Sequence, residues 1–117
     1  MPVMFEKSAW DTRQPRKDGL RILATRYWPR GLTRDQVDLY LPDLAPSKGL
    51  LTDYQSEQIQ HREFRRRYRE EMKGQKSLIR TLHWLSEGGQ VLTVMCNCED
   101  STYCHRRILA GLIERGA

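Results

Sequence analysis

Two stretches of the chain are apolar at almost every position, which is typical of strands buried inside a parallel sheet. They are Leu20–Thr25 and Gln90–Cys96, both rich in branched or aliphatic side chains. Residues 3–8 have a weaker pattern that suits a short edge strand. The sequence therefore predicts two central strands and one edge strand.

A long helix is predicted between these strands. From about Ser56 to Lys73 an apolar side chain recurs at every fourth position, at Phe64, Tyr68 and Met72. That spacing places the three side chains on one face of a helix, which can then pack against a core.

A second helix follows the first after a break. Gly74 is expected to end the long helix, and Leu78, Leu82 and Leu85 predict another over 76–87 with these three leucines facing the core.

Three more segments complete the predicted element order. Thr33 can cap a short helix that runs to about Tyr40, whereas 41–49 contains two prolines and is expected to form a loop. A last helix is predicted near the C-terminus, with its core face at Ile108, Leu109, Leu112 and Ile113.

This order of strand, helices, strand and helix predicts an α/β fold: a small, mostly parallel sheet flanked by helices. At 117 residues the chain has the usual length of one domain, so residues 1–117 are expected to form a single domain around one core.

Two unusual loops follow the two predicted central strands. The first, 26–31, reads Arg-Tyr-Trp-Pro-Arg-Gly, and the second precedes the last helix and ends in Cys104-His105-Arg106. In open parallel sheets, ligands bind beyond the carboxyl ends of the strands, so the two loops are expected to meet there. Arg26, Arg30 and Arg106 beside a helix N-terminus would form a site for a small, phosphate-like anion. Trp28, Pro29, Gly31 and Cys96 are expected to support that site.

The second loop also offers groups for catalysis. A helix N-terminus and neighbouring arginines favour the thiolate over the thiol, so Cys104 is the candidate nucleophile. His105 is the candidate proton carrier, and Glu99 the candidate group that orients either one. The chain would then be an enzyme acting on a small anionic substrate, without a cofactor.

Each of these residues also has a structural interpretation. Cys96, at the end of an apolar strand, can be an ordinary core residue. Arg26 and Arg30 can pair with acidic residues such as Asp38, Asp43 or Glu99 and hold the loops together. Cys104 and His105 can form a helix cap.

A metal site is the first alternative function. Cys96, Cys98, Cys104 and His105 are four ligands that zinc or iron accepts. Their spacing, however, differs from the paired Cys-x-x-Cys knuckles of common structural zinc sites.

The charge of the chain raises a second alternative, nucleic-acid binding. The formal net charge is +5, and positions 61–76 hold seven basic residues against three acidic ones. A helix of this kind can bind a phosphate backbone without reading base sequence, or it can be a solvated helix with internal ion pairs.

The remaining composition bears on the compartment. The three cysteines, Cys96, Cys98 and Cys104, are odd in number and clustered, which is a poor disulfide framework and suits a reducing compartment. The sequence has neither an apolar run of membrane-spanning length nor the pattern of a secretion signal. A basic cytoplasmic protein without membrane contact is therefore expected.

Several phrases of the sequence together resemble one family. They are Asp18-Gly19-Leu20-Arg21-Ile22-Leu23, Arg26-Tyr27-Trp28-Pro29-Arg30-Gly31, Leu44-Ala45-Pro46-Ser47, Glu63-Phe64 with Tyr68-Arg69-Glu70-Glu71, and Cys104-His105-Arg106. In their order and spacing they are similar to the domain of unknown function 488, or YeaO-like, family. The resemblance covers nearly the whole chain and implies a compact α/β domain of the prokaryotic cytoplasm without an assigned activity. The family positions that it marks in the first loop are Arg26, Trp28, Pro29, Arg30 and Gly31. In the second loop they are Cys98, Glu99, Cys104, His105 and Arg106.

Overall fold

A sheet of four parallel strands organises the computed structural model, which describes residues 4–97 and 105–116. The strands are β1 (Met4–Ser8), β2 (Leu20–Leu23), β3 (Leu39–Tyr40) and β4 (Leu92–Cys96), in the order β1-β4-β2-β3. All five residues of β4 are buried, as its nearly continuous apolar run predicts. The expected α/β fold with a small parallel sheet and flanking helices is confirmed.

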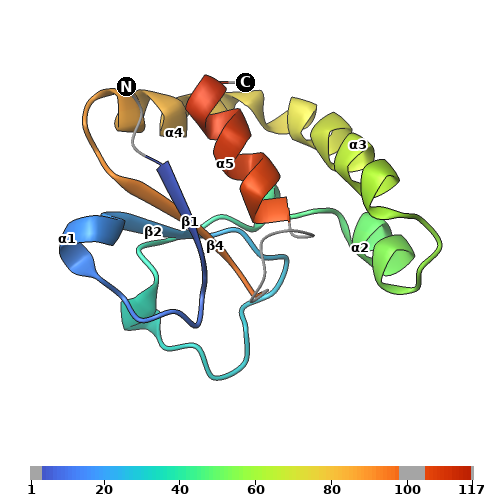
Figure 1. The fold of residues 1–117 in the computed structure, drawn as a ribbon, viewed down its shortest axis with the longest axis horizontal. Helices are drawn as coiled ribbons and strands as arrows, with labels where there is room; N and C mark the ends of the chain where they lie inside the picture. Colours follow the sequence, from blue (N-terminus) through green and yellow to red (C-terminus); the bar gives the residue numbers. More distant parts are fainter. Residues whose placement is uncertain (1–3, 98–104, 117) are drawn as a thin grey trace.

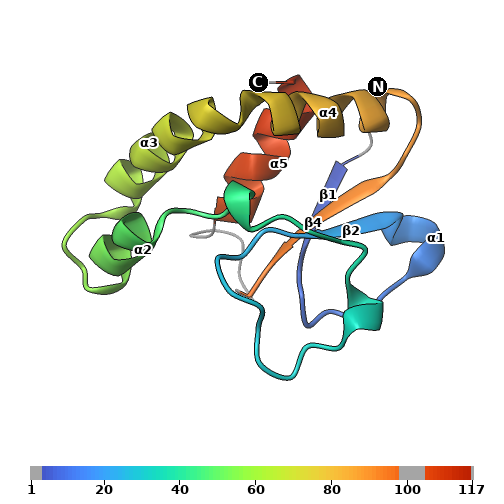
Figure 2. The same ribbon diagram turned by 180° about the vertical axis from the view of Figure 1, so that it is seen from behind.

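The longer helices lie on one side of this sheet. They are α2 (Lys48–Gln55), α3 (His61–Met72), α4 (Lys76–Glu87) and α5 (His105–Arg115), whereas the short α1 (Pro15–Asp18) lies beside β2. Helix α5 packs directly against β1 and β4. Figures 1 and 2 show α4 next to α5, and α3 extending away from the sheet. Among the residues the structure describes, no helix is both long and apolar enough to cross a membrane.

The two faces of the sheet bury different side chains because successive strand residues point in opposite directions. Ile22, Leu92 and Val94 pack against the helices in the larger part of the core. Leu23 and Met95 face the other way, into a smaller cluster covered by loops. The helix-facing part supplies most of the buried apolar surface.

A buried ion pair lies on the loop-covered face. Arg21 is completely buried, and its Nη1 donates to Oδ2 of Asp18 at 2.7 Å. Its Nε and Nη2 donate to the carbonyls of Gln36 and Asp11, and Lys7 forms a second ion pair with Asp18. The network attaches α1 and the loop before β3 to the sheet.

The predicted short helix from Thr33 to Tyr40 is wrong. Only Arg34–Gln36 form a helical turn, of the 3-10 type, and Leu39–Tyr40 form strand β3 beside β2. The amide of Arg21 donates to the Asp38 carboxylate at 2.8 Å, which helps to hold this segment extended.

The predicted loop over 41–49 is also wrong at its end, because α2 begins there. Ser47 caps α2 through its hydroxyl, which accepts from the amide of Leu50 and donates to Glu71 of α3. Ser56, expected at the start of a helix, instead follows the last residue of α2, and α3 begins only at His61.

Helix α4 has the predicted bounds but a slightly different buried face. Ile79, Leu82 and Ser86 are buried, while Leu78 is half-buried and Leu85 is 41% exposed. The face turned to the core is thus rotated by one position from the one that Leu78 and Leu85 suggest.

Candidate functional site

A cavity of about 380 Å³ lies at the carboxyl ends of β2 and β4. One wall is the segment 25–29, which follows β2, and the other contains Cys96, Asn97 and His105. Pro46, Leu51 and Gln55 complete the lining. Adjacent parallel strands bring the segments after them to the same edge, and here the first loop shares one cavity with Asn97 and His105, the described residues on either side of the second loop.

Arg26 forms the part of the first wall that faces α2. Its Nε and Nη2 donate to the carbonyl of Pro46 at 3.2 and 3.1 Å, and Nη2 also donates to that of Ala45. Among the described residues, it pairs with none of the acidic side chains that the sequence suggested as partners. Its Nη1 has no bond to another described residue, so this side chain both fixes the wall and keeps donors for a ligand.

Trp28 and Pro29 shape the turn beside Arg26. The indole Nε1 of Trp28 donates to the carbonyl of Leu32 at 2.8 Å, and its ring meets Tyr40 edge to face at 5.4 Å. Pro29 is buried, and its carbonyl accepts from the amide of Leu32, which closes the turn. These contacts attach Trp28 to Leu32 and Tyr40, and its role in supporting an anion site stays a prediction.

Arg30 and Gly31 form the tip of this turn. Both are exposed, and neither is among the described residues that line the cavity. Gly31 has a φ of 87°, in the region that favours glycine. The predicted anion contact by Arg30 is therefore not supported by its position.

His105, the first residue of α5, lies in the second wall. It is 7% exposed, and its Nε2 lies 2.5 Å from the carbonyl of Ala24. Because a carbonyl can only accept, the proton must be on Nε2, and in the neutral ring the lone pair is on Nδ1. The ring of Tyr68 packs against it edge to face at 5.5 Å.

The guanidinium of Arg106 lies beside β1 and β4. The residue is 3% exposed, with Nε 3.5 Å from the Glu6 carboxylate on β1 and Nη1 3.6 Å from Sγ of Cys96 on β4. It is not among the described lining residues. The guanidinium expected to bind an anion instead connects the first turn of α5 to two strands.

Cys98, Glu99 and Cys104 lie outside the described residues, so their predicted roles are untouched by this geometry. The same holds for the metal alternative, because two of its four ligands are among them. Within 4–97 and 105–116, no three His, Cys, Asp or Glu side chains are grouped as metal ligands are.

The sequence reasoning missed two polar residues of the lining. Asn97 accepts at Oδ1 from the indole of Trp10 at 2.7 Å, and Gln55 comes from the overlooked helix α2. The signal for α2 was Ser47, a strong helix-capping residue placed directly after a proline.

The comparisons with known proteins agree on one family. A family model described as "Active DUF488-N3 subclade" matches residues 6–117. The uncharacterized protein Rv3073c of Mycobacterium tuberculosis is 34% identical over 98 residues, which is 82% of this chain and 81% of that protein. The uncharacterized protein YeaO of Escherichia coli is 28% identical over 95 residues, 80% of this chain and 82% of that protein. No solved structure gives a significant match.

Proposed function

Since this chain belongs to the DUF488-N3 subclade, we propose that it binds a small, phosphate-like anion in the cavity at the ends of β2 and β4 and acts on it with a cysteine nucleophile. The observation that carries the proposal is the shared cavity, which brings segment 25–29 together with Cys96, Asn97 and the start of α5.

The start of α5 is the first element suited to an anion. The backbone N–H groups of a first helical turn have no partner within the helix and carry a partial positive charge. His105, the first residue of α5, lines the cavity, so this helix end borders the space where a ligand would sit. An anion at such a position is a common arrangement.

Arg26 is the second element. Two of its nitrogens are fixed by backbone carbonyls, and the remaining Nη1 is held in place at the cavity wall. A guanidinium that is already oriented loses little conformational freedom when it binds an oxyanion. We therefore assign the anion contact to Arg26 and the α5 end, rather than to Arg30 or Arg106.

The chemical step is assigned to Cys104, which directly precedes His105 in the sequence. Thiols at helix N-termini are activated because the helix end stabilises the thiolate. His105 would carry the proton at Nδ1, since Nε2–H donates to the carbonyl of Ala24. Glu99 keeps its predicted orienting role.

Protection against thermal unfolding tests the binding step. A ligand at about 100 times its Kd stabilises a protein by about 2.7 kcal/mol, so saturating phosphate or sulfate should raise the Tm by several degrees. The Arg26→Gln variant should lose this protection. Arg30→Gln, which removes the same charge from the same turn outside the cavity, should keep it. Equal protection of the two variants would refute the assignment.

Alkylation of the thiol tests the chemical step. In a variant with Cys96→Ala and Cys98→Ser, the rate of iodoacetamide modification should follow a titration well below that of an ordinary thiol, which lies at about 8.5. Phosphate should slow the reaction. A Cys104 that titrates normally, or that does not react, is structural.

A further inference from the structure

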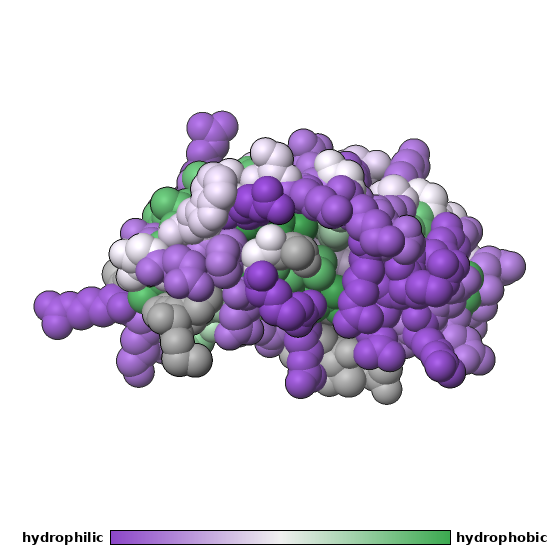
Figure 3. Space-filling view, turned by 90° about the horizontal axis from the view of Figure 1, so that it is seen from above, coloured by the Kyte–Doolittle hydropathy of each residue, from purple (hydrophilic) through white to green (hydrophobic). Residues whose placement is uncertain are grey.

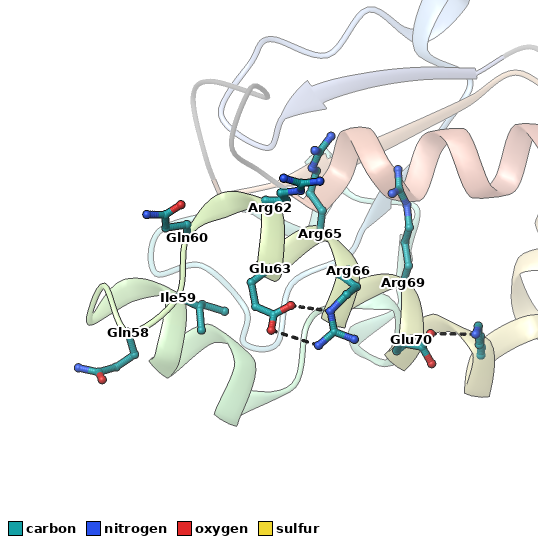
Figure 4. A pocket seen from close by; sticks show the side chains of 10 residues that line it. Gln58, Ile59, Gln60, Arg62, Glu63, Arg65, Arg66, Arg69 and Glu70 are labelled. Atoms are coloured by element: carbon teal, nitrogen blue, oxygen red, sulfur yellow. Dashed lines mark hydrogen bonds and ion pairs between the residues drawn. The ribbon is translucent and has the colours of Figure 1, made fainter.

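The basic residues of helix α3 are of two kinds: some pair with carboxylates, and others do not pair with a described carboxylate. Arg66 and Arg67 are paired with Glu63 and Asp53, and Lys73, which directly follows the helix, is paired with Glu70. Figure 4 shows the Glu63–Arg66 pair and the Glu70 pair, whereas Arg62, Arg65 and Arg69 point toward α5. The ion pairs expected along this helix therefore account for only part of its charge.

A groove of about 430 Å³ lies between α3 and α5. Arg65 and Arg69 line it from α3, and Arg107 and Arg115 line it from α5. All four side chains are exposed, and none makes a hydrogen bond or ion pair with another described residue. Its described lining contains no carboxylate. Four guanidinium groups thus face one groove without any counter-charge from that lining.

The arrangement of the four arginines is elongated. Arg65 and Arg69 are one helical turn apart, about 6 Å along α3, and Arg107 and Arg115 are about 12 Å apart along α5. Arg62 continues the row on α3 beyond the groove (Figure 4). In Figure 3, hydrophilic side chains crowd the part of the surface formed by α3. A chain of anions matches this shape better than one small ion does.

The floor of the groove is kept low by Gly111. A Cβ at this position would lie 3.2 Å from Nη1 of Arg115.

Besides the four arginines, the described lining of the groove contains one more titratable residue, His61. Burial and the charge of Arg65 lower its pKa, so it is mainly neutral at pH 7 and the arginines alone supply the charge.

We propose that the groove between α3 and α5 binds the sugar-phosphate backbone of a nucleic acid without reading its bases. Guanidinium groups suit phosphates, and the row extends over more than one phosphate spacing. The described lining contains no Phe, Tyr or Trp side chain, and the ring of its one histidine, His61, already packs against Tyr54 and Phe64. This site is distinct from the cavity at the strand ends.

A membrane surface is a poorer partner for the same charges. Peripheral helices insert an apolar face between lipids, but Phe64, Tyr68 and Met72, the apolar face of α3, are buried in the core. The helix therefore has no apolar face to insert.

Fluorescence anisotropy with a labelled oligonucleotide of about 20 nucleotides, single-stranded or duplex, tests the proposal over a range of salt concentrations. Four phosphate contacts predict that log K falls with log salt with a slope of about −3 for a single strand and about −4 for a duplex. The double variant Arg65→Gln, Arg107→Gln should roughly halve the slope and weaken binding to every sequence alike.

The matched control is the double variant Arg66→Gln, Lys73→Gln. It removes two positive charges from exposed positions, but from residues already paired with Glu63 and Glu70. It should leave the slope unchanged, and both double variants should unfold at the temperature of the parent. An equal loss in the two variants, no binding at low salt, or binding of inorganic tripolyphosphate in preference to the oligonucleotide would overturn the proposal.

The experiments distinguish the proposed cavity site from the proposed groove site, because each can be refuted without the other. Arg26→Gln should bind the oligonucleotide normally, and the oligonucleotide should not slow alkylation of Cys104. The groove variants, in turn, should keep their protection by phosphate in the cavity.

Discussion

Replacing Asp18 with asparagine should strongly destabilise the fold. The Asp18 carboxylate is 1% exposed, and it neutralises the fully buried Arg21 at 2.7 Å. The two carboxylate oxygens together accept from three donors: Lys7 at Oδ1, and Arg21 and the amide of Gln14 at Oδ2. Asparagine keeps the shape, but it removes the charge and turns one acceptor into a donor that faces another donor.

The expected loss follows from these contacts. Removing one partner of a buried ion pair costs about 3–5 kcal/mol, because the other charge stays buried without compensation. Asparagine can still accept one hydrogen bond from Arg21, so we expect about 3 kcal/mol for Asp18→Asn. For a chain of this length, that corresponds to a fall in Tm of roughly 10–15 °C.

Urea unfolding of three variants measures this effect. The control is Lys7→Gln, because the Lys7 side chain is 24% exposed and such pairs contribute about 1 kcal/mol or less. The double variant Asp18→Leu, Arg21→Met should lose less than Asp18→Asn, since the fully buried charge is removed and only the partly exposed Lys7 loses its partner. If Asp18→Asn costs no more than Lys7→Gln, the buried ion pair does not stabilise the fold as its burial predicts.

The pH dependence of stability gives a second test of the same residue. Burial alone would raise the pKa of Asp18, but hydrogen bonds from Lys7, the Gln14 amide and Arg21 outweigh it and keep the pKa below its ordinary value. A carboxyl with a lowered pKa in the folded state stabilises the fold above its unfolded pKa of about 3.9, and this contribution is lost as the pH falls through the folded value. The loss of stability below about pH 4 should therefore be smaller in Asp18→Asn than in the parent protein.

Three further substitutions test the fold and the groove by urea unfolding. Gly19→Ala should cost about 3 kcal/mol, because φ is 60° and the new Cβ would lie 2.2 Å from the carbonyl oxygen of Val91; a loss below about 1 kcal/mol would contradict this close approach. Ser47→Ala should cost about 1–2 kcal/mol, because the Leu50 amide loses its cap; unchanged stability would mean that water replaces the cap. Gly111→Ala should stabilise α5 by up to about 1 kcal/mol while it weakens oligonucleotide binding, and unchanged binding would show that the groove floor is not used.

The sequence predicted a helix or strand correctly where the local pattern of apolar residues matches the residues that the fold buries. Strand β4 was evident because it is central and buried on both faces, so that nearly every position is apolar. The segment 33–40 was misread because its structure depends on a distant partner. Its strand pairs with β2 through Ile22 and Leu39, and Arg21 holds Asp38 in place. A helix-capping threonine in the local sequence does not reveal such contacts.

In the candidate site, too, some features could be predicted from the sequence and others depend on contacts between distant residues. That the segment after β2 shares a cavity with Cys96 and Asn97 at the end of β4 follows from the parallel order of the strands, which the sequence indicated. Where each guanidinium points does not follow, because the partners are distant in sequence. Arg26 bonds to the carbonyls of Ala45 and Pro46, and Arg106 lies against Glu6 and Cys96. Three arginines that looked equivalent in the sequence thus have three different positions.

Helix α5 connects the two proposed sites while keeping them separate. His105 at its start lines the cavity, and Arg106 next to it is held by β1 and β4. Arg107, Gly111 and Arg115 recur every four residues and so lie on another face, the one that forms the groove. Because Arg107 and Arg115 are exposed and make no hydrogen bond or ion pair with another described residue, we expect that they can be replaced without moving the buried first turn. Substitutions on the two faces should therefore have additive effects on stability and separate effects on binding.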